Sequence, residues 1–239
     1  MPILEGSAVT KHFGGLAAVS GVDFAVDRGD VVGLIGPNGA GKTTLFNLIS
    51  GALVPESGTI RFQEHNITGL KPHLICRKGL ARTFQSVRIF PHLSAHANVQ
   101  VAALFGRADR MTVAEADREA VELLEFVGLS GMGAVPAKDL KLPSQKRLEV
   151  ARALATKPQL LLLDELMAGL NQTEVAETMD LAHRIRERGV TLFLIEHVMK
   201  AIMGICDRII VLHHGKKIAE GTPQDIATSR TVVEIYLGE

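Results

Sequence analysis

Short, mainly apolar runs recur along the chain and predict the buried strands of a parallel sheet. The clearest runs span residues 30–35, 160–163 and 190–195. Strands of a parallel sheet are covered by helices on both faces, so they show continuous apolar runs rather than an alternation of apolar and polar positions. The pattern therefore predicts an α/β fold.

The first part of the chain has a different pattern, in which apolar stretches alternate with turns. Residues 22–26 alternate with period two, and a turn at residues 27–30 leads into the first buried run. We therefore expect residues 3–35 to form an antiparallel β lobe that feeds the first parallel strand. Further strands are predicted at residues 59–62, 80–85 and 208–212, and further helices at residues 72–78, 145–156 and 231–237.

In the middle third of the chain the apolar residues recur at helical spacing, over residues 91–104 and 113–127. Residues 128–143 are rich in Gly, Pro and small side chains and are predicted to be a loop. The sequence thus predicts a single domain over residues 1–239, with a helical subdomain inserted at about residues 91–143. The second helix is expected to bury Val113, Ala116, Ala120, Leu124 and Val127, and to expose Glu115, Arg118, Glu119 and Glu122.

Composition and charge narrow the class of protein. The chain has 239 residues, 46% of them hydrophobic and only 4% aromatic, which suits aliphatic strands packed under helices. Lys and Arg number 26, as do Asp and Glu, and this balance argues against nucleic acid as a partner. Cys76 and Cys206 lack the spacing of a metal site, so a reducing, cytosolic compartment is expected. We expect residues 1–6 not to form a signal peptide, and any membrane contact to be made through a partner.

The first buried run leads directly into a glycine-rich segment that carries the strongest chemical signal. Such a loop lets backbone N–H groups surround a phosphate, while Lys42 adds a positive charge and Thr43 offers its hydroxyl to Mg²⁺. A glycine-rich turn that binds nothing would not need the strand before it, the Lys-Thr pair and the helix after it. The segment reads Gly36-Pro37-Asn38-Gly39-Ala40-Gly41-Lys42-Thr43-Thr44 and satisfies the P-loop pattern G-x-x-x-x-G-K-[ST].

Two acids, Asp164 and Glu165, end the second buried run. Beside a P-loop, the first acid is expected to hold Mg²⁺ and the second to polarise an attacking water. The alternative is that they cap the next helix. The pairing with a P-loop favours the catalytic interpretation.

The P-loop, Gln85, the acid pair and His197 occur in the order and at the approximate spacing found in ATPase subunits of ABC transporters, and the chain resembles this family over essentially its whole length. It is most similar to the ATP-binding subunits of branched-chain amino-acid uptake systems. Four stretches carry that finer resemblance: residues 13–19, 81–85, 168–171 and 236–239.

The resemblance implies roles for individual residues. Phe13 takes the place of an aromatic residue that stacks on adenine, although a core Phe on a strand is the alternative. Gln85 corresponds to a glutamine that senses Mg²⁺ and links the nucleotide to the helical subdomain, unless it is only a solvated strand end. Glu165 corresponds to the catalytic carboxylate, and His197 to a histidine that contacts the γ-phosphate. The other eight histidines are interpreted as structural.

One departure from the family is informative. The family signature Leu-Ser-Gly-Gly-Gln is expected before a helix that begins near Arg147, but residues 140–145 read Leu-Lys-Leu-Pro-Ser-Gln. Without a gap, Lys141 replaces the serine, and Leu142 and Pro143 replace both glycines; a short deletion is the other alignment. In this family the signature of one ATPase subunit faces the P-loop of another, and Pro143 has no N–H to offer a phosphate. Leu166, where the family usually has proline, is a smaller departure.

The resemblance therefore implies a P-loop NTPase core that binds ATP and Mg²⁺ and hydrolyses ATP to drive a membrane permease, from the cytoplasmic face of the plasma membrane. The altered signature favours pairing with a second, different ATPase subunit, while a homodimer is the alternative. Residues 86–104 are either the permease contact or an ordinary core helix. The permease could instead carry urea or another solute, or export lipid. The chain could also be a structural subunit that binds ATP with little hydrolysis.

Overall fold

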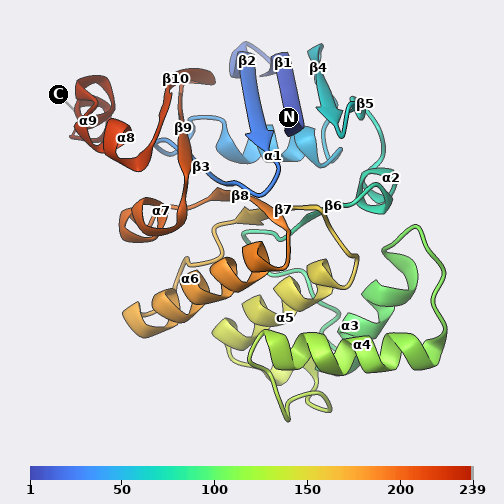
Figure 1. Ribbon diagram of the computed structural model, residues 1–239. Coiled ribbons are helices and arrows are strands. Elements are labelled where there is room, and N and C mark those ends of the chain that lie inside the picture. Colours follow the sequence, from blue (N-terminus) through green and yellow to red (C-terminus); the bar gives the residue numbers. More distant parts are fainter. Residues whose placement is uncertain (238–239) are drawn as a thin grey trace.

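The computed structural model describes residues 1–237 and contains two β-sheets and a separate group of helices. The antiparallel sheet lies at one end of the molecule, the larger sheet crosses the middle, and helices α3 to α6 lie on its far side (Figure 1). The α/β class, the antiparallel lobe and the helical subdomain expected from the sequence are confirmed. Of the last stretch quoted for the resemblance, Gly238 and Glu239 lie outside the described residues.

The antiparallel sheet is built by the N-terminal part of the chain. Its strand order is β2-β1-β4-β5, and all its pairings are antiparallel. The turn between the first two strands holds Gly14 and Gly15 at the rim of the molecule. The strands are β1 (Pro2–Phe13), β2 (Leu16–Asp27), β4 (Ser57–Phe62) and β5 (His65–Asn66).

The second sheet has the order β10-β9-β3-β8-β7-β6. Its neighbours pair in parallel except at the β9–β10 edge, which is antiparallel. Because the strands are parallel, their carboxyl ends meet at one edge of the sheet, where ligands bind in folds of this kind. The strands are β3 (Val31–Ile35), β6 (Leu80–Arg82), β7 (Leu160–Asp164), β8 (Thr191–Ile195), β9 (Arg208–His213) and β10 (Lys216–Gly221).

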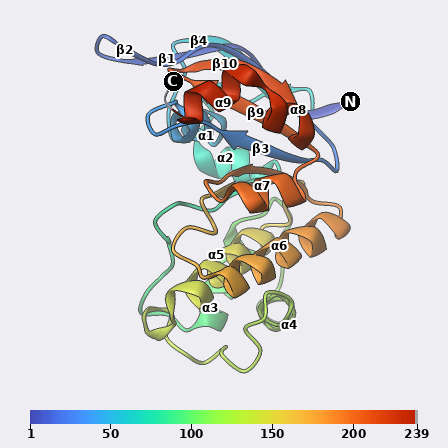
Figure 2. The ribbon, with the colours of Figure 1, turned by 90° about the vertical axis from the view of Figure 1, so that its left-hand side faces the viewer.

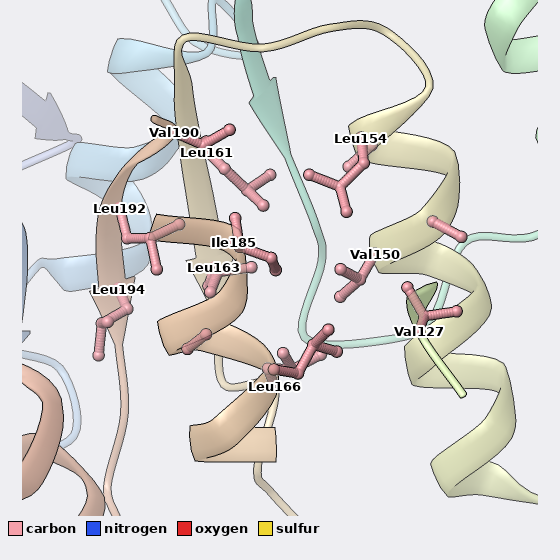
Figure 3. Close-up of a cluster of buried hydrophobic side chains, with 14 of the residues drawn as sticks. Val127, Val150, Leu154, Leu161, Leu163, Leu166, Ile185, Val190, Leu192 and Leu194 are labelled. Atoms are coloured by element: carbon pink, nitrogen blue, oxygen red, sulfur yellow. The ribbon is translucent and has the colours of Figure 1, made fainter. Parts of the chain in front are cut away.

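Successive residues of the central strands face opposite cores, which explains why the interiors of these strands are apolar. On one face, Leu162 and Phe193 pack with helix α1 (Lys42–Ile49) and the antiparallel sheet, and the rings of Phe46 and Phe193 are 5.1 Å apart. On the other face, Leu161 and Leu163 meet the helices α5 (Leu142–Leu154) and α6 (Gln172–Glu187) (Figure 3). The sheet is thus buried on both sides.

The remaining helices cover the edges and the far side of the large sheet. Helices α8 and α9 lie on the β9–β10 side, next to the antiparallel sheet, and α7 contacts α6 and α8, whereas α3 and α4 lie beyond α5 (Figure 2). The strands β5 and β10 and the helices α7 and α8 have no counterpart among the expected elements, and α6 is expected only as the helix after the acid pair, without bounds. The helices are α2 (Pro72–Arg77), α3 (Ala95–Phe105), α4 (Val113–Phe126), α7 (Met199–Ile205), α8 (Pro223–Thr228) and α9 (Arg230–Leu237), with a 3₁₀ turn at Ala137–Asp139.

Three sequence expectations in the helical region are wrong. Val113, at the first position of α4, is 66% exposed rather than buried. Glu119, expected on the polar face, is buried, because its carboxylate pairs with Arg107 at 2.9 Å and Lys157 at 2.6 Å. Helix α5 begins at Leu142 rather than at Gln145, because a proline needs no N–H partner in the first turn of a helix.

Candidate functional site

The glycine-rich segment forms a loop between β3 and α1 at the carboxyl edge of the large sheet. Gly36 and Gly41 have φ angles of 151° and 103°. A Cβ on Gly36 would lie 2.1 Å from the carbonyl oxygen of Leu212, and one on Gly41 would lie 2.2 Å from that of Ala18. These two positions therefore require glycine, both for their conformation and for the close approach of neighbouring backbone.

Lys42 begins helix α1 and turns its ammonium group back over the loop. Its Nζ donates hydrogen bonds to the carbonyl oxygens of Gly36 at 2.7 Å and Pro37 at 3.0 Å, and the side chain is buried. Burial lowers the pKa of Lys42, against the opposing effect of Glu165 and Asp164. The loop thus holds a positive charge at the N-terminus of a helix, which is a favourable place for an anion.

A cavity of about 600 Å³ opens over this loop, a size typical of small-molecule sites. Phe13, 49% exposed, lies on its wall near the β1–β2 turn, and the ammonium group of Lys11 is 5.8 Å from its ring centre. His214, interpreted from the sequence as structural, also faces the cavity from the β9–β10 turn. The lining is Phe13, Leu16, Ala17, Ala18, Asn38, Gly39, Ala40, Gly41, Lys42, Thr43, Thr44, Gln85, Glu165 and His214.

Three of the residues singled out in the sequence lie together, with Glu165 in contact with the other two. Its Oε2 accepts a hydrogen bond of 2.8 Å from Gln85 Nε2, and its Oε1 lies 3.0 Å from His197 Nε2. Gln85 lies three residues beyond the end of β6, rather than at the end of the strand as expected. Glu165 follows β7 and His197 follows β8 closely, so neighbouring parallel strands deliver them to the same edge.

Asp164, the last residue of β7, is buried and has an ion-pair partner that sequence reasoning missed. Its Oδ2 lies 2.7 Å from Arg82 of β6, and Arg82 also donates to Asn47 of helix α1 at 2.7 Å and to Ser50, just after that helix, at 2.9 Å. Arg82 belongs to a stretch quoted for the family resemblance, but nothing in its local pattern indicates a partner 82 residues away.

The residues present fit a magnesium ion held jointly with a nucleotide. Within residues 1–237 no group of three or more His, Cys, Asp or Glu side chains is placed to bind a metal alone. Mg²⁺, however, usually takes one or two protein ligands and completes its shell with phosphate and water oxygens. The buried Oδ1 of Asp164 has no hydrogen-bond partner, which suits a water bound to such an ion.

The altered signature forms the first turn of α5. Lys141 is the residue before the helix and does not cap it with its side chain, and Pro143 occupies the second helical position. Leu142 is 45% exposed. This turn therefore presents an apolar side chain and a residue without an N–H where the family places glycines.

Among residues 1–237, no helix is both long enough and apolar enough to cross a membrane.

Comparisons with known proteins identify the family of the chain. A family model described as ABC transporter matches residues 19–168, and one described as branched-chain amino acid ATP-binding cassette transporter matches residues 216–239. The chain is 43% identical to the high-affinity branched-chain amino acid transport ATP-binding protein BraF of Pseudomonas aeruginosa, over 100% of this chain and 98% of BraF.

Solved structures point the same way. The ADP conformation of MJ1267, an ATP-binding cassette of an ABC transporter, superposes with a TM-score of 0.90 and 31% identity over the full length of both chains. A dimeric, post-hydrolysis cassette, MJ0796 bound to ADP and Pi, superposes with a TM-score of 0.84 and 25% identity, over 92% of this chain and 98% of that one. The chain therefore belongs to the ABC transporter family, as one of its ATP-binding ATPase subunits.

Proposed function

We propose that this chain hydrolyses ATP to drive uptake of branched-chain or related amino acids through a membrane permease. The observation that carries the hydrolytic part is the position of Glu165, which lies between Gln85 and His197 at the wall of the P-loop cavity. The matched C-terminal family segment and the similarity to BraF support the solute class. Urea or another small solute, or a lipid for export, is the alternative, because the ATPase subunit does not touch the solute.

In this proposal the P-loop from Gly36 to Thr44 and the charge of Lys42 bind the phosphates, and Phe13 stacks on the adenine ring. Thr43, Gln85 and Asp164 would hold Mg²⁺, directly or through water. Bound Mg²⁺ would neutralise phosphate charge and orient the γ-phosphate.

Glu165 and His197 act on the reacting atoms. Glu165 orients a water and accepts its proton as the oxygen attacks the γ-phosphorus and the bond to ADP breaks, which yields ADP and phosphate. His197 steadies the γ-phosphate, and its contact with Glu165 holds both side chains toward the same point. A purely structural, nucleotide-gated subunit would not need this arrangement.

The altered signature supports pairing with a second, different ATPase subunit. Pro143 offers no N–H and Leu142 is apolar, so ATP on the partner's P-loop would face an incomplete site. ATP on this chain's P-loop would meet the partner's signature, which the proposal takes to be intact. The proposal therefore predicts one site that hydrolyses ATP fast and one that hydrolyses it slowly.

The test is ATP turnover of the purified chain, alone and with the candidate second ATPase subunit. We expect turnover to rise at least about tenfold in the mixture, because each site is completed by the other chain. A homodimer that reaches the full rate without the second subunit would refute the heterodimer, and tight ATP binding with no turnover in either setting would refute hydrolysis.

A groove beside helix α3 fits the permease contact. It has a volume of about 530 Å³ and contains exposed rings at Phe90 and Phe105 together with the charges of Arg88, Glu149 and Arg152. One face of α3 is core, with Val99 and Ala103 buried, so the core-helix interpretation of residues 86–104 holds for that face, and only the groove side is available to a permease. We propose that the groove binds a cytoplasmic segment of the permease, which would hold this chain at the cytoplasmic face of the plasma membrane.

Replacing Phe105 with glutamate should weaken association with the permease at least about tenfold, because a 70% exposed ring at the groove becomes a charge. ATP affinity of the isolated chain should not change. Co-purification with the permease measures the first quantity and nucleotide titration the second. The matched control is Val121→Glu, because Val121 is a 55% exposed side chain on the outer face of α4. Equal retention of the permease by both variants would contradict the assignment of the groove.

A further inference from the structure

Lys146 lies in the interior of the protein, on the helix that begins with the altered signature. Its side chain is 5% exposed, and its Nζ donates hydrogen bonds to the carbonyl oxygens of Glu165 at 3.1 Å, Leu166 at 2.9 Å and Ala168 at 2.7 Å. An ammonium group has three N–H donors, so all of them are used on a single turn of backbone.

That turn carries the candidate catalytic carboxylate. Glu165 has a φ of 51°, in the left-handed region that non-glycine residues seldom adopt, and its carbonyl also accepts a hydrogen bond from the Ala168 N–H at 3.2 Å. Such conformations persist when surrounding contacts fix them. Proline at position 166 would restrict φ there, but Leu166 does not, so the turn depends more on contacts from outside itself.

Two other contacts hold the same turn. Glu196, which precedes His197, accepts a hydrogen bond of 2.8 Å from the Met167 N–H. Leu166 points into the core cluster with Val150 of α5 (Figure 3). The turn is thus fixed from the end of β8 and from α5, and the contacts from α5 include three hydrogen bonds from a buried cation.

Burial and the neighbouring carboxylates act on the charge of Lys146 in opposite directions. Burial lowers the pKa of its ammonium group, while Glu196, Glu149 and Glu165 act in the opposite direction. Burial raises the pKa of Glu196 to about 7. The three carbonyl dipoles point their negative ends at the cation, which compensates part of the lost hydration.

The first turn of α5 lies close to Gly169, the residue that follows this backbone turn. A Cβ on Gly169 would lie 3.6 Å from Cδ2 of Leu142, which stands at a glycine position of the family signature. Leu142 and Lys146 are one helical turn apart, so they lie on the same face of α5. A displacement of the signature turn would therefore also displace the backbone of Glu165.

We propose that Lys146 is a positioning residue for Glu165: its three hydrogen bonds fix the Glu165–Ala168 turn and join the signature end of α5 to the carboxylate that acts on water. This inference rests on the proposed catalytic role of Glu165. Lys146 does not line the P-loop cavity.

The test replaces Lys146 with methionine, which keeps the length of the stem and removes the donors and the charge, in the complex with the second ATPase subunit. We expect kcat to fall about 30-fold with KM for ATP changed by less than about twofold, because the carboxylate is misplaced while the P-loop is intact. In a Glu165→Gln background, single-turnover hydrolysis should fall by less than about twofold further, because the two residues act through one group. Lys138→Met, an exposed lysine of the 3₁₀ turn, is the control.

The outcomes distinguish a failure of the positioning role of Lys146 from a failure of the catalytic role of Glu165. A normal kcat in Lys146→Met, or the same fold loss in both backgrounds, overturns the positioning role. Near-normal turnover in Glu165→Gln overturns the catalytic role of Glu165 instead. If Lys146→Met does not fold, Lys146→Arg replaces it: the planar guanidinium cannot direct three donors to these converging carbonyls, so kcat should fall at least about fivefold. A normal kcat in that folded variant would also overturn the inference.

Discussion

Replacing Glu165 with glutamine is expected to lower ATP turnover of the two-subunit complex about 1000-fold, which corresponds to about 4 kcal/mol in the activation free energy. Glutamine has the same shape and retains an acceptor oxygen for Gln85, but its amide cannot take a proton from water. ATP binding should stay within about threefold, since the phosphates are bound by the loop and Lys42. Steady-state turnover and nucleotide titration measure the two quantities separately.

The same substitution also tests the asymmetry between the two sites. At the corresponding acid of the second ATPase subunit, glutamine should lower turnover by less than about threefold, because that subunit's P-loop faces Leu142 and Pro143. Glu122→Gln, on an exposed position of α4, is the control for loss of a carboxylate. Equal losses from the two catalytic substitutions would show that both sites turn over at similar rates, and the altered signature would then have no effect on hydrolysis.

Much of the fold is readable in the sequence because its signals are local. The strands β3, β7 and β8 are mainly apolar because they are buried on both faces, and the P-loop is defined by residues adjacent in the chain. The edge strand β10, with the sequence Lys-Lys-Ile-Ala-Glu-Gly, has too few apolar residues to show either periodicity. Residues 142 and 143 are expected in a loop partly because of Pro143. A proline in the first turn of a helix loses no hydrogen bond, however, because the N–H groups there have no partner within the helix.

The long-range contacts of the site have no comparable signal. Gln85, Glu165 and His197 could be grouped because they follow predicted parallel strands or belong to a recognised order of motifs. The Arg82–Asp164 ion pair and the three bonds of Lys146 depend on which strand and helix become neighbours. A basic residue inside an amphipathic helix is ordinarily solvated, so only the packed structure shows that Lys146 is buried. His214 reaches the cavity through the pairing of β9 and β10, which the sequence did not predict.

Replacing Lys42 with methionine should weaken ATP binding about 100-fold, or about 2.7 kcal/mol, because the phosphates lose a buried point charge at the helix N-terminus. Methionine fills a similar volume and suits an interior position, so the melting temperature should change by only about a few degrees. Titration with a fluorescent ATP analogue measures the affinity, and Lys138→Met is the control.

Lys42 has a second role that the experiment must separate from its charge. Its Nζ donates to the carbonyl oxygens of Gly36 and Pro37, so methionine also removes two bonds that shape the loop. Lys42→Arg keeps the charge but not the compact geometry of those bonds. If charge dominates, arginine should recover at least about tenfold of the lost affinity, whereas a loop that needs the lysine geometry would leave both variants equally weak. Unchanged affinity in Lys42→Met would mean that backbone N–H groups bind the phosphates without help from the lysine.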